Sequence, residues 1–461
     1  MLTMEFQPII MAAGRGSRMT EIIAKTPKAL LPVGNKPMVW YPIKMLEKAG
    51  FEEAIIIVQR GHRKSIERVL VDELQVNVKL EFVSIPDEED WGTADSLRFI
   101  RDKIKTDVLV VSSDLISDVS VQRVADVHRA HDATLTMLLS ASKDYASETI
   151  AVPGPKSKKK SEVEFVGLES QEHGNRLLFL SSEADFEENI TFRKSIFRKH
   201  PCIDIRNDLV DGHLYLLKKW VVDFLHEHKS VTTVKGELLP YLVKKQFSQK
   251  NNGIHAIEEN INIAMADSPQ KGDGRDLYDY GEEDELCKLA REWSTWNDHS
   301  GDMAECYHGN KIRCYGYVMD DGLLMRVNNL AAFCDANRQA SKFLSEIAGK
   351  ELANIHPQVN VPQKAQVGTE CMVGEWTNVG EKVTIKKSFI GKHCNVSEKV
   401  RMTNCIVMNH VTVSESCNAQ GCVIGDNVHI GENTDLKDCI ILENVAPSSK
   451  LSNEVIGHGF K

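Results

Sequence analysis

The C-terminal part of the chain carries a repeat that leaves little freedom for its fold. From residue 373 onward, aliphatic residues recur at intervals of six, six and five, so one full repeat takes seventeen residues. A unit this short cannot bury its apolar face alone, but the stacked coils of a parallel β-helix bury one another. The sequence therefore predicts a β-helix of hexapeptide repeats with these side chains inside it: Val361, Val367, Val373, Val379, Ile385, Ile390, Val396, Met402, Val407, Val413, Ala419, Ile424, Ile430, Leu436 and Ile441.

The same repeat accounts for several cysteines. One small residue stands at the same place in successive coils, seventeen residues apart: Cys371, Ser388, Cys405, Cys422 and Cys439. We interpret this column as small side chains stacked at a corner of the β-helix, rather than as a disulfide or metal site. The chain contains no C-x-x-C pair, which argues against structural zinc. No metal and no cofactor are expected.

The composition is typical of a globular protein. Charged residues make up 26% of the 461 residues, and the net charge of −10 disfavours general binding to DNA or RNA. No apolar run is long enough to cross a membrane, and the first residues lack the features of a signal peptide. We therefore expect a protein of the cytosol, with Met1 and Met4 as candidate translation starts.

Strand-like and helix-like segments alternate over residues 1–248. Apolar runs of strand length at 8–11, 54–58 and 107–111 are separated by amphipathic segments such as 38–50. This alternation predicts an α/β domain with a doubly wound, mostly parallel sheet. Ligands of such sheets bind beyond the carboxyl ends of the strands.

A less regular region follows. Periodicity is lost over 249–298, where Asn, Gly, Asp and Glu are frequent, and we expect a partly flexible linker there. Order returns with a predicted strand at 313–318 and a predicted helix at 336–347. The predicted division of the chain is an α/β domain over 1–248, a linker over 249–354 with an ordered segment at 312–353, and the β-helix over 355–461.

The loop after the first predicted strand is suited to phosphate. It contains Gly14, Gly16, Ser17 and Arg18, and Lys28 follows one residue after a proline. Glycines let the backbone approach a phosphate closely, and successive N–H groups form an anion site. Arginine binds phosphate oxygens in pairs, and lysine adds a point charge. The pattern predicts a loop that holds a nucleoside diphosphate or triphosphate.

Several stretches resemble the sugar-1-phosphate nucleotidyltransferases, among them the mannose-1-phosphate guanylyltransferases. They are GRGSRM, TPKALLPVGNKPM, WGTADSL and the strand that ends at Ser113-Asp114, and the likeness extends to a left-handed β-helix. The resemblance implies that Arg18 and Lys28 stabilise nucleotide phosphates, that Asp114 holds Mg²⁺ and that Gly92-Thr93 lies against the base. Such transfer is catalysed mostly by positioning and by cations.

Departures from that family point away from catalysis. Ser113 stands where the family usually has a glycine, and the stretch 163–171 has no counterpart of the lysine that grips the sugar phosphate. No second metal aspartate is recognisable. We therefore predict no catalytic residue and interpret the following as the remnant of a nucleotide site: Gly14, Gly16, Ser17, Arg18, Lys28, Gly92, Thr93 and Asp114.

A more specific resemblance, to the gamma subunits of eukaryotic translation initiation factor 2B, runs over nearly the whole chain. It includes RCYGYVMDDGLLMRVNNLAAFCDANRQ at 313–339, which the sugar transferases lack. It implies a scaffold or regulatory subunit of a guanine nucleotide exchange factor, which pairs with the epsilon subunit and joins alpha, beta and delta subunits. Initiation factor 2 would be the substrate of the complex. Since epsilon carries the exchange activity on a C-terminal helical domain, the end of the chain after the β-helix favours gamma.

Two alternatives stay open. The chain is either a non-catalytic subunit of that factor or an active mannose-1-phosphate guanylyltransferase. The phosphate loop either senses a nucleotide or sugar nucleotide, or persists because the fold needs a tight turn after the first strand.

Other features have plain interpretations beside functional ones. The basic tract 156–160 is expected to be a solvated loop, and His200 and His213 to be core or surface residues rather than ligands. Trp293 and Trp296 either anchor a partner or pack locally.

Overall fold

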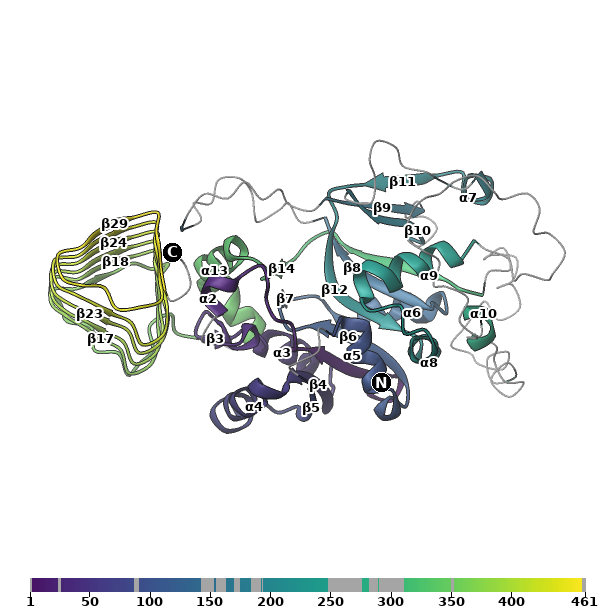
Figure 1. The fold of residues 1–461 in the computed structure, drawn as a ribbon, viewed down its shortest axis with the longest axis horizontal. Helices are drawn as coiled ribbons and strands as arrows, with labels where there is room; N and C mark the ends of the chain where they lie inside the picture. Colours follow the sequence, from purple (N-terminus) through teal and green to yellow (C-terminus); the bar gives the residue numbers. More distant parts are fainter. Residues whose placement is uncertain are drawn as a thin grey trace.

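The computed structural model describes residues 2–23, 26–86, 91–141, 153–154, 163–169, 175–183, 192, 194–247, 276–281, 289, 311–349 and 352–457. Figure 1 shows an α/β domain and, beside it, a stack of coils that forms the C-terminal β-helix. Helix α13 (Leu330–Ala348) lies between them. The predicted tract 156–160 and both linker tryptophans lie outside the described residues.

A seven-stranded sheet forms the centre of the α/β domain. Its strand order is β13-β8-β12-β6-β1-β4-β5, and β12 runs antiparallel to both of its neighbours while the other pairs are parallel. The predicted doubly wound, mostly parallel sheet is thus confirmed. The strands are β1 (Phe6–Met11), β4 (Glu53–Gln59), β5 (Lys79–Ile85), β6 (Asp107–Ser112), β8 (Leu135–Ser140), β12 (Val210–Leu217) and β13 (Cys314–Met319).

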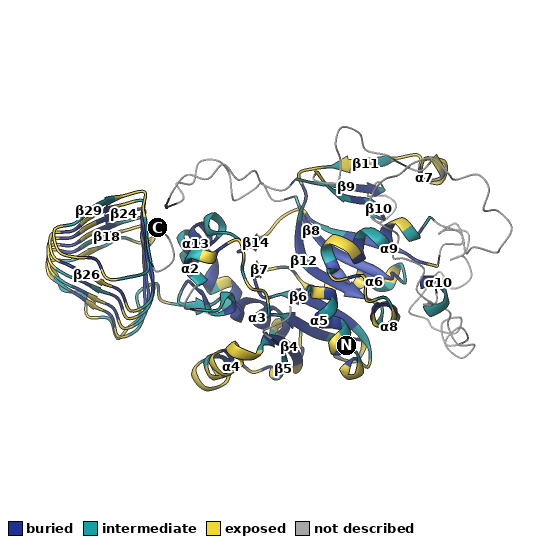
Figure 2. Ribbon diagram, viewed as in Figure 1, coloured by how far each residue is buried: buried dark blue, intermediate teal, exposed yellow. Residues whose placement is uncertain are grey.

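Helices cover both faces of this sheet. Successive residues of a strand point to opposite faces, so Ile9 packs with α5 and α8, while Ile10 packs with α3 and α6. Figure 2 shows the buried strands between these half-exposed helices. The helices of the domain are α1 (Leu2–Glu5), α2 (Thr20–Ile23), α3 (Trp40–Lys48), α4 (Arg63–Glu67), α5 (Thr93–Phe99), α6 (Val121–Ala130), α7 (Lys194–Lys199), α8 (Lys219–Glu227), α9 (Leu239–Lys245) and α10 (Leu277–Tyr280).

Smaller sheets flank the central one. A three-stranded antiparallel sheet has the order β10-β9-β11, and two short antiparallel pairs join β2 to β3 and β14 to β7. Their bounds are β2 (Pro32–Val33), β3 (Lys36–Pro37), β7 (Leu115–Ser117), β9 (Glu164–Glu169), β10 (Leu177–Ser182), β11 (Ile203–Arg206) and β14 (Leu324–Arg326).

The expected division of the chain needs one correction. The sequence placed 312–353 in a linker, yet β13 pairs with β8 along its whole length and is the edge strand of the central sheet. The next strand, β14, pairs with β7 inside the domain. This segment is ordered as predicted, but its apolar strand is part of the α/β domain. Helix α10, from the predicted flexible stretch, also buries Leu277 in the domain core.

The β-helix has three faces, each a parallel sheet with one strand per coil. The β15 face comprises β15 (Gln366–Val367), β18 (Thr384–Lys386), β21 (Arg401–Thr403), β24 (Asn418–Gln420), β27 (Asp435–Lys437) and β29 (Lys450–Ser452). The β16 face comprises β16 (Met372–Val373), β19 (Phe389–Ile390), β22 (Ile406–Val407), β25 (Val423–Ile424), β28 (Ile440–Ile441) and β30 (Val455–Ile456). The β17 face comprises β17 (Asn378–Val379), β20 (Asn395–Val396), β23 (Thr412–Val413) and β26 (His429–Ile430).

The interior of the β-helix follows the predicted register. The aliphatic residues of the repeat from Val373 to Ile441 are all buried. The column of Cys371, Ser388 and its seventeen-residue successors is buried as well, and each cysteine in it is a free thiol. This agrees with a structural role for the column.

One face of the β-helix is joined to the rest of the molecule. On the β16 face the residues that point outward, such as Met372, Phe389 and Ile406, are buried in a cluster with Phe333 and Phe343 of α13. A hydrogen bond of 2.9 Å from Thr26 Oγ1 to Asp426 Oδ2 adds a polar contact. The α/β domain and the β-helix therefore share a core, although the sequence repeat predicted only the interior column.

Candidate functional site

The site begins at Asp114, which follows the carboxyl end of β6 in the middle of the sheet. Its side chain is 2% exposed. The Nζ atom of Lys28 lies 2.5 Å from its Oδ2, and the hydroxyl of Ser112 donates to its Oδ1 at 2.7 Å. The sequence named Lys28 and Asp114 for a shared site, and the structure brings them together as a direct ion pair.

A second cation on the same carboxylate comes from far along the chain. Arg326, the last residue of β14, donates from Nη2 to both oxygens of Asp114 at 3.1 and 3.0 Å, and from Nε to Oδ1 at 3.2 Å. The pairing of Arg326 with Leu115 across β14 and β7 fixes its position. The amide of Val327 also donates to the carbonyl of Asp114 at 3.0 Å. Asp114 is therefore held on both its backbone and its side chain.

More charged groups lie beside this pair. β12 changes register between Asp211 and Tyr215, and His213 between them has φ +50°. The Tyr215 hydroxyl donates to Asp211 Oδ2 at 2.6 Å, and the His213 amide donates to Asp211 Oδ1 at 2.8 Å. Lys235 forms an ion pair with Glu164, and its Nζ lies 3.8 Å from Asp211 Oδ2. Three carboxylates thus face three cations.

The electrostatics of the cluster follow from burial and from these partners. Burial alone would raise the pKa of Asp114, but Arg326 and Lys28 hold that pKa well below its usual range. Burial, with the charge of Arg326 beside it, lowers the pKa of His213 to about 3, so this imidazole is neutral at pH 7. Among the described residues, no group of three or more His, Cys, Asp or Glu side chains is arranged to hold a metal ion.

The predicted phosphate loop lies on the surface after β1. Gly14, Ser17 and Arg18 are exposed, and a turn is closed by the amide of Met19 donating to the carbonyl of Gly16 at 2.8 Å. Gly16 has φ +68°, a conformation that glycine adopts without strain. A side chain at Gly14 would meet nothing within 4 Å. The loop is therefore open on the side of Gly14.

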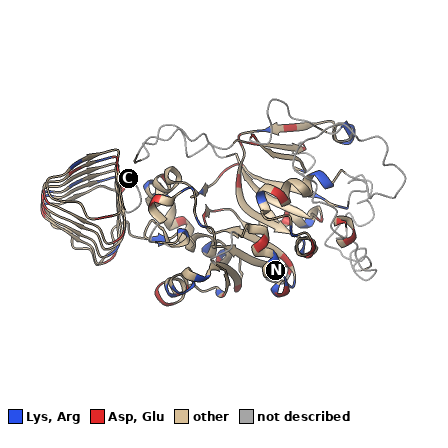
Figure 3. Ribbon diagram, in the orientation of Figure 1, with Lys and Arg blue, Asp and Glu red and all other residues tan. Residues whose placement is uncertain are grey.

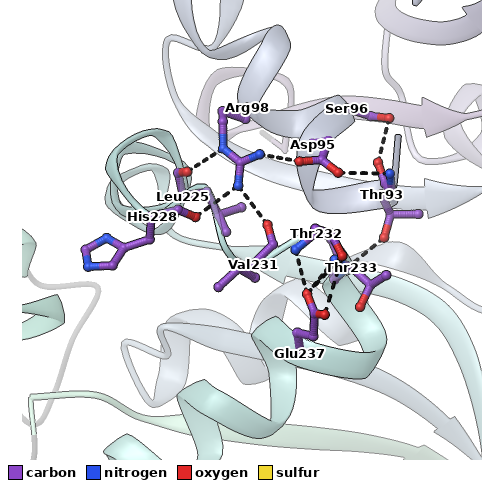
Figure 4. A network of polar contacts seen from close by, with 12 residues as sticks. Thr93, Asp95, Ser96, Arg98, Leu225, His228, Val231, Thr232, Thr233 and Glu237 are labelled. Carbon is purple, nitrogen blue, oxygen red and sulfur yellow. Dashed lines mark hydrogen bonds and ion pairs between the residues drawn. The ribbon is translucent and has the colours of Figure 1, made fainter. Parts of the chain in front are cut away.

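Gly92 and Thr93 pack against a neighbouring loop. They begin helix α5, and the helix N-terminus is covered by a neighbouring loop (Figure 4). The carbonyl of Thr232 accepts from the amide of Ala94 at 2.9 Å, and Thr93 Oγ1 accepts from the amide of Val234 at 2.8 Å. A Cβ at residue 92 would lie 2.1 Å from the Thr232 oxygen. Close packing with this loop therefore explains the glycine.

The loop that covers α5 is itself held in place. Glu237 accepts from the amides of Thr232 and Thr233 at 2.5 and 3.0 Å, and Arg98 donates to the carbonyl of Val231 at 2.7 Å. Figure 4 shows Arg98 also reaching the carbonyls of Leu225 and His228 at 2.6 and 3.0 Å. These bonds make the cover a fixed part of the fold.

Sequence reasoning found two of the six charged residues of this cluster, Lys28 and Asp114. It missed the other four, because no sequence spacing connects residues from four separate parts of the chain: Arg326, Asp211, Lys235 and Glu164. His213, interpreted as a core or surface residue, lies in the cluster. His200 is buried with its Nδ1 2.8 Å from Glu169, as a core histidine.

In the part of the chain that the structure describes, no helix is long and apolar enough to span a membrane. Figure 3 shows acidic and basic residues interspersed over the helices of the α/β domain.

Comparisons with known proteins match both domains. A family model described as nucleotidyl transferase matches residues 7–149, and one described as the EIF2B subunit epsilon LbH domain, a left-handed β-helix, matches residues 353–453. The chain is 30% identical to "Translation initiation factor eIF2B subunit gamma" of Schizosaccharomyces pombe, over 83% of this chain and 74% of that protein. The subunit of the same name from Dictyostelium discoideum is 26% identical, over 84% of this chain and 87% of that protein.

Enzymes are matched over a shorter stretch. A mannose-1-phosphate guanyltransferase of Candida albicans is 30% identical, but over 28% of this chain and 36% of the enzyme.

Proposed function

Because the chain belongs to the family of gamma subunits of translation initiation factor 2B, as its likeness to the Schizosaccharomyces pombe protein shows, we propose that it is a non-catalytic subunit of that guanine nucleotide exchange factor. In this proposal it supports the exchange of GDP for GTP on initiation factor 2 in the cytosol. Its direct partner is the epsilon subunit, and alpha, beta and delta subunits complete the assembly.

The proposal that the chain is non-catalytic is supported by the surroundings of Asp114. A nucleotidyl transferase needs this carboxylate as a ligand of Mg²⁺, with cations directed at the phosphates. Here Lys28 and Arg326 neutralise the carboxylate from within the protein, at 2.5 Å and 3.0 Å from Oδ2. A divalent cation would have to displace both of these cations, and Lys28 would have to leave Asp114 to reach a phosphate. Arg326 belongs to the stretch 313–339, which the sequence resemblance sets apart from the sugar transferases.

The competing proposal is an active guanylyltransferase, and the partial match to those enzymes favours it. The open approach to Gly14 fits the other alternative, a loop that senses a nucleotide or sugar nucleotide. Neither alternative gives a role to Arg326.

Two measurements test the proposed function. The purified chain, incubated with GTP, Mg²⁺ and mannose 1-phosphate, is expected to release no pyrophosphate above a blank without protein. Co-expressed with an epsilon subunit, it is expected to co-purify in a stable complex and to leave the exchange rate of initiation factor 2 dependent on epsilon. Release of pyrophosphate that depends on mannose 1-phosphate would overturn the non-catalytic assignment, and failure to co-purify would overturn the assignment as a subunit.

A further inference from the structure

Two buried aspartates lie past the same end of the pairing between β6 and β12. These strands are antiparallel, with Leu214 opposite Val111. Asp114 comes three residues after Val111, and Asp211 comes three residues before Leu214, so both aspartates leave the pairing on the same side. Their side chains are 2% and 1% exposed. Carboxylates buried to this degree need cations that compensate their charge.

Arg326 is a cation that the two carboxylates share. Its guanidinium donates to both oxygens of Asp114, at 3.1 and 3.0 Å from Nη2 and at 3.2 Å from Nε. Burial opposes the charge of this side chain, but the negative charges of Asp114 and Asp211 raise its pKa above the ordinary value for arginine. One guanidinium thus compensates two buried carboxylates.

The backbone that presents Arg326 is fixed by the fold. The turn between β13 and β14 is closed on Asp118, whose Oδ1 accepts from the amide of Leu323 at 2.8 Å and whose amide donates to the Leu323 carbonyl at 3.2 Å. Gly322 in this turn has φ +122°, which favours glycine, and a Cβ there would lie 2.8 Å from Asp118 Oδ1. The guanidinium therefore extends from a short strand that is anchored at its turn.

The charge balance indicates what the guanidinium replaces. The cluster holds three carboxylates and three cations, so removal of Arg326 leaves one negative charge in excess. Mg²⁺ and Mn²⁺ bind carboxylate oxygens, and Mg²⁺ commonly takes one or two carboxylates and keeps several waters. The likeness to nucleotidyl transferases implies Mg²⁺ at Asp114, but both oxygens of this carboxylate already accept from Arg326. The residues present therefore do not fit a bound metal ion while Arg326 stays in place.

We propose that Arg326 takes the place of a divalent cation in this chain, so that Asp114 and Asp211 form a latent metal site that the guanidinium keeps closed. The inference rests on the proposed function, in which the chain is non-catalytic, and it identifies the side chain that closes the site. Lys28 is not equivalent, because its Nζ contacts a single oxygen of Asp114. Arginine stays charged throughout the physiological pH range, so this closure does not depend on pH there.

The test compares Mn²⁺ binding by the full unaltered chain and by Arg326→Ala, which removes the guanidinium and leaves both aspartates. The electron paramagnetic resonance signal of free Mn²⁺ measures the binding. The variant is expected to bind about one Mn²⁺ per chain, at least about tenfold more tightly than the unaltered chain. Mn²⁺ is also expected to raise the melting temperature of the variant and to leave that of the unaltered chain unchanged.

Further variants isolate the cause. Arg326→Gln is a smaller change, which keeps the measurement possible if Arg326→Ala does not fold, and it is expected to bind Mn²⁺ as well. Arg326→Ala combined with Asp211→Asn is expected to lose the binding. Arg206→Ala, at an arginine paired with Asp208 on the surface, is the matched control and is expected to bind Mn²⁺ no better than the unaltered chain.

The outcomes separate this inference from the proposed function. Failure of both Arg326 variants to bind Mn²⁺ more tightly than the unaltered chain would overturn the inference and leave the non-catalytic assignment intact. Binding that persists without the Asp211 carboxylate would overturn it too, since the site would then not need the second aspartate. Pyrophosphate released by the unaltered chain would instead overturn the proposed function.

Discussion

At the scale of single residues, the most informative contact is the one between Arg326 and Asp114. A carboxylate that is 2% exposed is costly to bury, and its two cations make burial tolerable. Removing one partner of such a pair leaves a charge that is only partly compensated. The pair therefore connects the segment after β13 to the end of β6. The interaction free energy of the two side chains can be measured by substituting each of them.

We predict that Arg326→Gln lowers the free energy of unfolding by about 3 kcal/mol, because among the described residues the Asp114 carboxylate then keeps hydrogen bonds from Lys28 and Ser112 alone. Asp114→Asn is also destabilising, since it leaves both cations without their carboxylate. The double variant is expected to be more stable than the sum of the two single changes implies, by more than about 1 kcal/mol. Urea unfolding of the four proteins measures this difference.

A surface ion pair supplies the control for that cycle. Arg206 and Asp208 are paired at 2.6 Å, but their side chains are 31% and 58% exposed. Arg206→Gln is expected to cost less than about 1 kcal/mol. Additive effects of the changes at Arg326 and Asp114 would show that the two side chains do not stabilise each other.

What the sequence revealed of this cluster depended on local patterns. Lys28 follows a proline and Asp114 follows an apolar strand, so each stood out from its neighbours. Arg326 lies 212 residues after Asp114, in a strand of three residues whose pairing with β7 has no signature of its own. The sequence thus identified Asp114 and one of its two cationic partners, Lys28. The tertiary structure was needed to find the other, Arg326.

At the scale of elements, the regular parts of the fold were predictable and the connections were not. Alternating apolar strands and helices predicted the central sheet, and the seventeen-residue repeat predicted the coils. The strand β13 was recognised, but its place in the sheet was missed, because the long irregular stretch before it suggested a linker. Which sheet a strand belongs to depends on the strand with which it pairs, and β13 pairs with β8.

Two glycines of the predicted site provide a prediction at this scale. Gly92→Ala is expected to destabilise the protein by about 2 kcal/mol or more, because the new Cβ would lie 2.1 Å from the backbone oxygen of Thr232 and one of the two chain segments must move. Gly14→Ala is the matched change, with nothing within 4 Å of its Cβ. It is expected to alter the free energy of unfolding by less than about 0.5 kcal/mol.

Chemical denaturation of the two variants is the measurement. Equal stability of both would mean that the loop of Thr232 and Thr233 moves away from α5 at little cost. The hydrogen bonds that the amides of this loop donate to Glu237 argue against such movement.

At the scale of the whole molecule, the shared core between α13 and the β16 face determines whether the α/β domain and the β-helix unfold together. Two domains joined by a flexible tether unfold separately, whereas two that share a buried cluster unfold together. The cluster here combines Trp40 and Tyr41 of α3, Phe333 and Phe343 of α13 and outward residues of the coils. A chain built in this way holds its β-helix at a fixed position relative to the α/β domain.

Phe389 tests this coupling, because its ring points out of the coils into the cluster and is 2% exposed. Phe389→Ala is expected to cost about 3–5 kcal/mol, most of it at the interface rather than inside the β-helix, where Ile390 still fills the coil. Calorimetry is therefore expected to show one transition for the unaltered chain and two for the variant. Phe197→Ala, a change at a side chain that is 49% exposed, is expected to keep a single transition at nearly the same temperature. A single, uniformly lowered transition for Phe389→Ala would mean that the coils and the α/β domain remain one cooperative unit without this ring.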